Sequence, residues 1–228
     1  MARFDPREVC ALVLAGGMGS RMGGVDKGLQ LLGGQPLAAH CVQRLQAQTA
    51  GVPGLIALNA NRHPEQYARW GCPVWADGIS GYAGPLAGFQ TALQHCTAAH
   101  QSASPAGFAY LLTVACDTPR FPLDLLARLA QAMQFQGADI AVAGAPETGP
   151  DGRTALRSQP VFCLLRTSLA PSLQTFLAAG GGKVDAWTAQ HRTIVVAFDQ
   201  AHDDPLAFFN ANTLTELNAL ENTLPPAL

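Results

Sequence analysis

The stretch VCALVLAGGMGSRMGGVDKG, residues 9–28, decides the fold that we expect of this chain. It opens with an uncharged apolar run at 9–14, which has the length and composition of a buried strand. A glycine-rich loop follows and carries two cations, Arg21 and Lys27. In an open α/β sheet, ligands bind beyond the carboxyl ends of the strands, where such a loop would lie. The stretch therefore predicts a first strand that ends in a ligand-binding loop.

Apolar runs of strand length alternate with segments of helical periodicity along the rest of the chain. The strands that we predict are 9–14, 55–58, 74–76, 109–115, 140–143, 161–165 and 194–198, and the helices are 36–47, 86–96, 123–133 and a last one beginning at Thr213. The strands are too apolar for a half-exposed sheet, so we expect the α/β class: a single-domain, Rossmann-like three-layer αβα fold with a mainly parallel sheet. The Ala, Ser, Gly and Pro content of 97–105 and 144–158 predicts mobile loops there.

The bulk composition favours one domain with no general affinity for polyanions. Of 228 residues, 48% are hydrophobic and 13% are charged, and the formal net charge is -2. We therefore expect a single domain over 1–228, frayed at 1–7 and 222–228, that binds neither nucleic acid nor membranes. The six cysteines form no CxxC pair, which indicates reduced thiols in a cytoplasmic protein. We expect neither a secretion signal nor a membrane span.

The glycine-rich loop has the chemistry of a phosphate cradle. Its glycines let the backbone approach a ligand closely, and successive N–H groups can then hold phosphate oxygens. Arg21 can grip a phosphate with two hydrogen bonds, and Lys27 adds a point charge. Lys27 follows Asp26 and precedes Gly28, so the loop is not a Walker A motif, and Met22 stands where a dinucleotide fingerprint needs glycine. A mobile surface loop is the alternative.

The segment LAGGMGSRMGGVDKG at 14–28 resembles the signature loop of the molybdenum cofactor guanylyltransferases, a family of nucleotidyltransferases. Four further motifs are similar to that family's in the same order: LNANRH at 58–63, GPLAG at 84–88, CDTP at 116–119 and NANT at 210–213. The resemblance spans nearly the whole chain and is looser from 143 to 204. Ser20 departs from it, because many members carry a second basic residue before Arg21.

The resemblance implies a nucleotidyltransferase fold and transfer of GMP from GTP to the phosphate of molybdopterin, or of its molybdenum-bearing form, with release of pyrophosphate. It implies Mg²⁺ held by Asp117, whose oxygen ligands suit that ion. The catalytic residues would be Arg21, Lys27 and Asp117. The nucleotide-binding residues would be Leu14, Ala15, Gly16, Gly17, Lys27, Asn59, Asp77, Gly84, Pro85 and Asp117.

Several of these residues have a simpler structural interpretation. Asp117 precedes Thr118-Pro119 and Asp77 precedes Gly78, so each could stabilise a turn, and Pro85 could open a helix. Thr213-x-x-Glu216 is a capping-box pattern. Of Asn210 and Asn212, one would cap the last helix and the other would reach the site. The segment 180–183, Gly-Gly-Gly-Lys, either ends a helix or binds the pterin phosphate.

Two other functions remain open from the sequence. One is a cytidylyltransferase that acts on the same pterin, and the other is a nucleotide sensor without catalysis. Cys116 is not expected to act as a nucleophile, because no histidine adjoins it in sequence. Besides GTP and molybdopterin, the resemblance allows other molybdenum cofactor biosynthesis proteins or recipient molybdoenzymes as partners.

Overall fold

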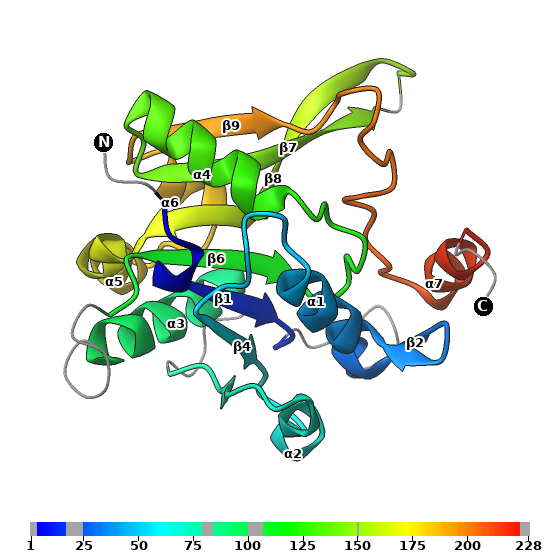
Figure 1. Cartoon of the computed structure of the whole chain (residues 1–228), viewed down its shortest axis with the longest axis horizontal. Helices are drawn as coiled ribbons and strands as arrows, with labels where there is room; N and C mark the ends of the chain where they lie inside the picture. Colours follow the sequence, from blue (N-terminus) through cyan, green and yellow to red (C-terminus); the bar gives the residue numbers. More distant parts are fainter. Residues whose placement is uncertain (1–3, 17–24, 79–83, 100–106, 150, 224–228) are drawn as a thin grey trace.

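A computed structural model describes residues 4–16, 25–78, 84–99, 107–149 and 151–223 (Figure 1). In these residues, seven strands form one sheet in the order β5-β4-β1-β6-β8-β7-β9. Only β8 runs antiparallel to its neighbours, β6 and β7; the other pairs are parallel, which confirms the mainly parallel sheet. The strands are β1 (Val9–Leu14), β4 (Leu55–Asn59), β5 (Val74–Trp75), β6 (Tyr110–Ala115), β7 (Ile140–Thr148), β8 (Thr154–Arg166) and β9 (Thr193–Ala197).

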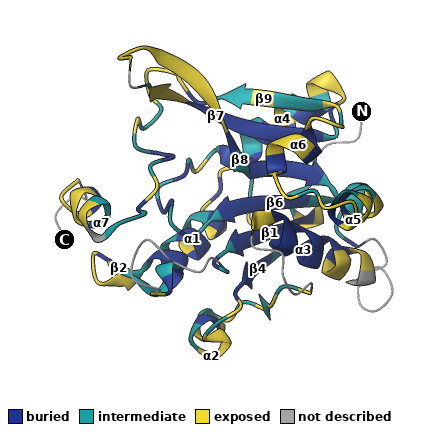
Figure 2. Ribbon diagram, turned by 180° about the vertical axis from the view of Figure 1, so that it is seen from behind, coloured by how far each residue is buried: buried dark blue, intermediate teal, exposed yellow. Residues whose placement is uncertain are grey.

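Helices cover both faces of this sheet. The helices are α1 (Leu37–Gln46), α2 (Pro64–Tyr67), α3 (Pro85–Ala99), α4 (Leu125–Gln136), α5 (Ala170–Ala178), α6 (Val184–Thr188) and α7 (Leu214–Glu221). One core cluster joins one face of the sheet to α1 and α4, and a second joins the other face to α3, α5 and α6 (Figures 1 and 2). The three-layer αβα fold is therefore confirmed.

The central strand β1 shows why the sheet needs both layers. Val9, Ala11 and Val13 belong to the first cluster, whereas Cys10 and Leu12 belong to the second. All five side chains are inaccessible to solvent. Because successive side chains of a strand point to opposite faces, an unbroken apolar run is what a strand covered on both faces requires.

The expectation of a mobile loop at 144–158 is wrong. Residues 144–148 of β7 and 154–158 of β8 pair as an antiparallel ribbon that extends from the sheet (Figure 1). Most of these residues are exposed, as the yellow ribbon in Figure 2 shows. A ribbon with few buried side chains needs no apolar alternation, so its backbone pairing leaves no hydrophobic pattern in the sequence. Of the other expected loop, 97–105, residues 97–99 belong to α3 and the rest lie outside the described residues.

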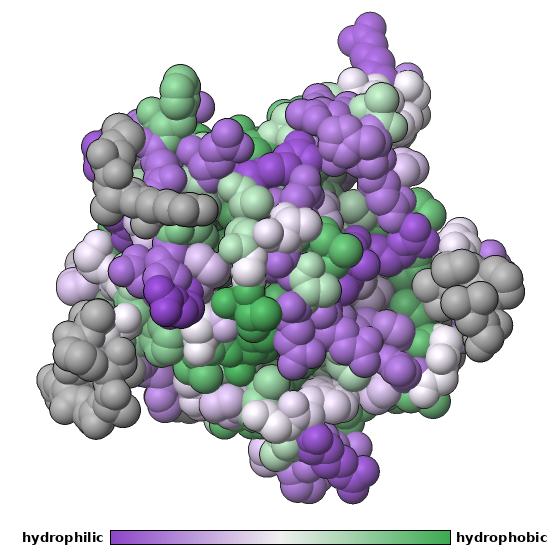
Figure 3. All heavy atoms as spheres, viewed as in Figure 1, coloured by the Kyte–Doolittle hydropathy of each residue, from purple (hydrophilic) through white to green (hydrophobic). Residues whose placement is uncertain are grey.

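Smaller elements surround the core. The hairpin β2 (Leu31–Leu32) and β3 (Gln35–Pro36) packs with α7 through a small cluster that includes Leu32, Leu217 and Leu220. The suggested frayed ends contain residues that hydrogen-bond to the body: the Pro6 carbonyl accepts from the Gly54 N–H (3.1 Å), and Thr223 accepts from Arg120 (2.8 Å). Hydrophilic side chains cover much of the face shown in Figure 3. No helix of the described residues is long and apolar enough to cross a membrane.

Candidate active site

Four neighbouring parallel strands deliver the candidate residues to one edge of the sheet. Leu14, the last residue of β1, pairs with Asn59 of β4 on one side and with Ala115 of β6 on the other. Backbone hydrogen bonds continue past the strand ends: the Ala15 N–H donates to the Asn59 carbonyl (2.8 Å), and the Cys116 N–H donates to the Leu14 carbonyl (3.1 Å). Leu14, Ala15, Gly16, Asn59 and Asp117 therefore start from a common edge. Gly17 and Arg21 lie outside the described residues.

Lys27 and Asp117 meet at this edge. The Lys27 ammonium lies 3.1 Å from Asp117 Oδ2 and donates to Asn212 Oδ1 at 2.8 Å. The exposed fractions of the Lys27 and Asp117 side chains are 18% and 19%, so the pair is largely but not fully shielded from water. One cation thus joins residues from three distant parts of the sequence.

The segment that precedes α7 is fastened to the turn after β6. The Ala211 N–H donates to the Asp117 carbonyl (2.8 Å), and the Thr118 hydroxyl donates to the Asn210 side chain. A hydrogen bond from the Thr118 N–H to the Ala115 carbonyl (3.3 Å) closes the turn itself. The Asp117 carboxylate pairs with Lys27 instead. Asp117 is therefore not needed as a turn-stabilising side chain.

The cap of α7 shows which of Asn210 and Asn212 reaches the candidate site. Thr213 is the N-cap of α7, and its hydroxyl accepts from the Glu216 N–H (3.1 Å). In return, the Glu216 carboxylate accepts from the Asn212 N–H (2.9 Å). The predicted capping box is confirmed, except that the Glu216 carboxylate bonds back to the N–H of Asn212, one residue before the N-cap. Neither asparagine is the cap, and Asn212 is the one whose side chain reaches Lys27.

A second polar group holds Asp77 beside the same edge. The Asn59 amide donates to Asp77 Oδ1 (2.9 Å) and to the Trp75 carbonyl (3.1 Å). Asn61 donates to Asp77 Oδ2 (2.7 Å) and accepts from the Asp77 N–H (2.8 Å). A Cβ added to Gly16 would lie 2.9 Å from Asn61 Nδ2, so Gly16 lies in direct contact with this group.

Gly84 and Pro85 begin α3, and the segment 180–183 lies beside them. A Cβ added to Gly84 would lie 3.8 Å from the Gly182 carbonyl oxygen. The same segment closes α5: the Gly180 N–H donates to the Leu177 carbonyl (2.9 Å), and Gly180 has a φ of +84°. The helix-ending role is therefore confirmed, and it places these glycines next to the start of α3.

The described side chains offer oxygen ligands for a cation at one point of this edge. Asp117 contributes a carboxylate and Asn212 an amide oxygen, both within reach of the Lys27 ammonium. Elsewhere in the described residues, Asp124, His202 and Asp203 place possible ligand atoms within 4.8 Å of one another. A side-chain cation pairs with these carboxylates too: Arg128 Nη1 lies 2.7 Å from Asp203 and 3.6 Å from Asp124.

Cys116 has the properties of a packing residue. Burial raises the pKa of its thiol, and the nearby Asp117 carboxylate raises that pKa further. The raised pKa disfavours the thiolate, and the thiolate is the only form of cysteine that is an effective nucleophile. The structure agrees with the expectation that Cys116 takes no covalent part in a reaction.

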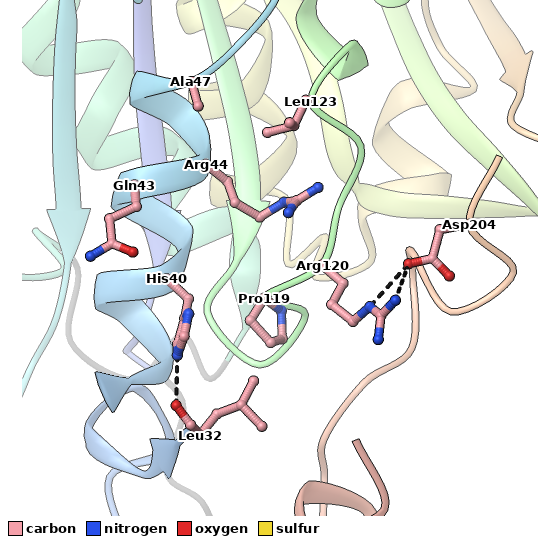
Figure 4. A pocket seen from close by; sticks show the side chains of 9 residues that line it. All are labelled: Leu32, His40, Gln43, Arg44, Ala47, Pro119, Arg120, Leu123 and Asp204. Atoms are coloured by element: carbon pink, nitrogen blue, oxygen red, sulfur yellow. Dashed lines mark hydrogen bonds and ion pairs between the residues drawn. The ribbon is translucent and has the colours of Figure 1, made fainter. Parts of the chain in front are cut away.

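A cavity of about 440 Å³ adjoins the loop that follows Asp117 (Figure 4). It lies between α1 and that loop, and Arg44 and Arg120 project into it. Arg120 is paired with Asp204 at 2.6 Å, while the Arg44 Nε donates to the Phe121 carbonyl at 2.6 Å. Neither Lys27 nor Asp117 lines this cavity, so it flanks the candidate site and is not its centre.

A glycine-rich sequence after the first strand, with a lysine–aspartate pair at the carboxyl edge of a three-layer sheet, is typical of nucleotide-binding α/β proteins. A family model described as the MobA-like NTP transferase domain matches residues 11–194. The chain belongs to this family of nucleotidyltransferases.

Individual relatives are similar over nearly their whole length. The chain is 56% identical to the molybdenum cofactor guanylyltransferase of Albidiferax ferrireducens, covering 95% of this chain and 97% of that one. It is 48% identical to the protein of the same name from Bordetella petrii, covering 95% and 99%. Among solved structures, the molybdopterin-guanine dinucleotide biosynthesis protein A of Archaeoglobus fulgidus superposes with a TM-score of 0.68 at 19% identity, covering 93% and 97%, which supports the fold.

Proposed function

We propose that this protein transfers GMP from GTP to the terminal phosphate of molybdopterin, or of its molybdenum-bearing form, and releases pyrophosphate. The observation that carries the proposal is the 56% identity over 95% of the chain to a molybdenum cofactor guanylyltransferase. The product is the molybdopterin guanine dinucleotide cofactor. The meeting of Lys27 and Asp117 at the carboxyl edge of the sheet supports the same reaction.

The reaction is an exchange of one phosphoanhydride bond for another. An oxygen of the pterin phosphate attacks the α-phosphorus of GTP, the bond from that phosphorus to the β-phosphate oxygen breaks, and pyrophosphate leaves with both electrons of that bond. The attacking oxygen is already anionic, so no general base is needed. Catalysis then depends on bringing two anions together and on neutralising the charge of the leaving group.

We assign the charge-neutralising roles to Lys27 and to residues of the glycine-rich segment before it. Lys27 and Arg21 would hold the triphosphate, together with the backbone N–H groups of Gly16 and Gly17. Asp117 and Asn212 hold the Lys27 ammonium at the edge. A cation held in place in advance needs little reorganisation when the substrate binds.

Asp117 would hold Mg²⁺. This ion prefers oxygen ligands and keeps several waters, so one carboxylate with the phosphates of the nucleotide is a usual protein environment for it. The carboxylate of Asp117 and the neighbouring amide oxygen of Asn212 fit that requirement. When bound, the ion would neutralise part of the charge on the triphosphate.

The nucleoside would lie at the carboxyl ends of β4 and β5, beside the start of α3. Asn59 and Asp77 would bind its polar groups, and Leu14, Ala15, Gly84 and Pro85 would also contact the nucleotide. The support is the network that fixes the Asp77 carboxylate with two amide groups, since a pre-oriented acceptor discriminates better between ligands than a mobile one.

The direct test is a transfer assay with purified protein, molybdopterin, Mg²⁺ and either GTP or CTP, with pyrophosphate release as the readout. We expect turnover with GTP to exceed turnover with CTP. Preference for CTP would identify a pterin cytidylyltransferase, and nucleotide binding without any pyrophosphate release would identify a sensor.

Two variants test the assigned residues. Lys27→Ala should lower kcat/KM for GTP by about 100-fold or more, because it removes a preorganised cation from the developing charge. Asp117→Asn should abolish the stimulation by Mg²⁺ without changing the far-UV circular dichroism spectrum. Arg153→Ala and Asp151→Asn, on the exposed turn between β7 and β8, are the matched charge controls. Normal turnover by Lys27→Ala, or an unchanged Mg²⁺ titration of Asp117→Asn, would refute the respective assignment.

We further propose that the protein works in the cytoplasm and passes its product to other molybdenum cofactor biosynthesis proteins or to recipient molybdoenzymes. All six cysteines are free thiols, which fits a reducing compartment.

A further inference from the structure

The residues on either side of Lys27 are shaped around one buried tyrosine. The Tyr67 hydroxyl donates a hydrogen bond to Asp26 Oδ1. On the other side of Lys27, a Cβ added to Gly28 would lie 2.5 Å from the Tyr67 hydroxyl oxygen and 3.0 Å from its ring. Asp26 and Gly28 thus both fit against Tyr67, and Lys27 between them is free to reach Asp117.

The Asp26 carboxylate is buried in this arrangement and therefore needs a hydrogen-bond donor. Asp26 is only 8% exposed and Tyr67 is 0% exposed. A buried carboxylate without hydrogen bonds is strongly unfavourable, so the hydroxyl is a necessary part of the arrangement. Burial raises the pKa of Tyr67, and the hydrogen bond to Asp26 raises that pKa further, so the hydroxyl remains a donor.

The backbone of Asp26 is fastened at the same time. Its carbonyl accepts from the Leu29 N–H (3.2 Å) and from the Gln30 side chain (3.2 Å). The Gln30 N–H in turn donates to the Lys27 carbonyl (3.0 Å). Hydrogen bonds within the segment therefore hold the main chain at 26–30, and the bond between Asp26 and Tyr67 links this segment to α2.

Tyr67 also belongs to the segment that holds Asp77. It ends α2, only a few residues after Asn61, and its ring packs edge-on against Trp70 with centroids 5.5 Å apart. The segment 59–67 thereby connects Asp77, which we assign to the nucleoside, with Asp26 beside Lys27, which we assign to the triphosphate.

We infer that Tyr67 is a positioning residue for guanylyl transfer: through Asp26 and Gly28 it fixes the main chain from which Lys27 reaches the reacting phosphates. The inference rests on the proposed function. Tyr67 acts on the origin of that side chain, while Asp117 and Asn212 hold the ammonium itself. A small displacement of a catalytic group is enough to lower a rate substantially.

The test compares Tyr67→Phe in two backgrounds, the wild type and Lys27→Ala. In the wild type, loss of the hydroxyl should lower kcat/KM for GTP by about tenfold, while KM for molybdopterin changes by less than about twofold. In the Lys27→Ala background the same substitution should change kcat/KM by less than about twofold. A residue that acts through Lys27 has nothing left to position once the ammonium is gone, whereas a general loss of structure would act equally in both backgrounds.

Tyr110→Phe is the matched control. Tyr110 packs against Phe4 and Arg166 at the start of β6, and its substitution should leave kcat/KM unchanged. A conservative pair gives a second measurement should Tyr67→Phe fail to fold. Asp26→Asn keeps an acceptor for the hydroxyl and should retain activity within about threefold, and Asp26→Ala should lose about tenfold.

The outcomes separate the inference from the proposed function. If the wild type does not transfer GMP, the proposed function fails. If the wild type is active and Lys27→Ala is impaired, the inference is overturned by normal activity of Tyr67→Phe or by equal losses in both backgrounds. Equal activities of Asp26→Asn and Asp26→Ala would also overturn it.

Discussion

Gly88 lets the first turns of α3 pack directly against the ends of β1 and β4. A Cβ added at this position would lie 2.5 Å from Leu14 Cδ2 and 2.6 Å from Asn59 Oδ1. Asn59 is 4% exposed and holds Asp77, so it has little room to move away. One hydrogen atom in place of a methyl group thus permits the contact between helix and candidate site.

Gly88→Ala should therefore damage the site. Replacing glycine by alanine inside a helix ordinarily stabilises the helix by about 1 kcal/mol, but overpacking a buried contact costs about 1–3 kcal/mol. We expect the free energy of unfolding to fall and KM for GTP to rise by about tenfold, as measured by urea unfolding and initial rates. The control is Gly182→Ala, whose added Cβ would have no neighbour within 4 Å. A Gly88→Ala variant that is more stable than the wild type with an unchanged KM would contradict the prediction.

Single residues could be predicted where the topology alone brings them together. Asn59 ends a parallel strand, Asp77 and Asp117 each come after one, and parallel strands present their carboxyl ends at one edge. The partnership of Asp26 and Tyr67 has no such signal, because it joins residues 41 positions apart through a side-chain bond. Spacing along the sequence does not encode that contact.

At the scale of elements, Arg128 ties α4 to the end of β9 and to the loop beyond it. Its Nη1 lies 2.7 Å from Asp203 Oδ1, and its guanidinium lies over the Phe198 ring at 3.8 Å from the centroid. The side chains of Arg128 and Asp203 are 15% and 7% exposed, so this ion pair is better shielded than an ordinary surface pair.

Asp203→Asn should reveal this link through its pH dependence. Burial raises the pKa of Asp203, but hydrogen bonds from Arg128 and from the Gln200 N–H lower it by more, so the net pKa is below the usual 3.8. A lowered pKa in the folded state means that the carboxylate stabilises the fold above about pH 4 and stops doing so as the pH falls through the folded pKa. At pH 7 the variant should lose about 1–3 kcal/mol.

Urea unfolding between pH 7 and pH 3 measures this difference. The gap between wild type and Asp203→Asn should be constant down to about pH 4 and should shrink below it. Asp151→Asn, with a side chain 63% exposed, should show no gap at any pH. A gap for Asp203→Asn that persists unchanged at pH 3 would show that the carboxylate charge is not its cause.

Elements were predictable where a buried side-chain pattern identifies them. The strand predicted at 9–14 coincides with β1, and the helix predicted at 36–47 with α1 at Leu37–Gln46. The ribbon of β7 and β8 beyond Ala143 could not be predicted, since its pairing rests on backbone hydrogen bonds between exposed residues. Short helices such as α6 at Val184–Thr188 are too brief to show a helical period.

For the whole molecule, the two core clusters lie on opposite faces of one sheet and share its strands. Cys41 and Cys116 belong to the cluster under α1 and α4, and Cys10 and Cys163 to the cluster under α3 and α5. All four thiols are buried, and burial raises the pKa of Cys163 to about 12. Each core thus contains its own natural probe, which is unreactive while that core is folded.

We propose that the chain is one cooperative domain, and we expect both cores to unfold in a single transition. Neither cluster can lose its packing alone, because β1 contributes alternate side chains to both and either loss would expose the same strand. Pulsed alkylation at increasing urea, read by mass spectrometry, should give one midpoint for Cys41 and Cys163, coincident with the loss of far-UV circular dichroism. Labelling of Cys163 at a clearly lower urea concentration than Cys41 would instead mean that the layer of α3, α5 and α6 detaches first, and that the chain contains two units of unequal stability.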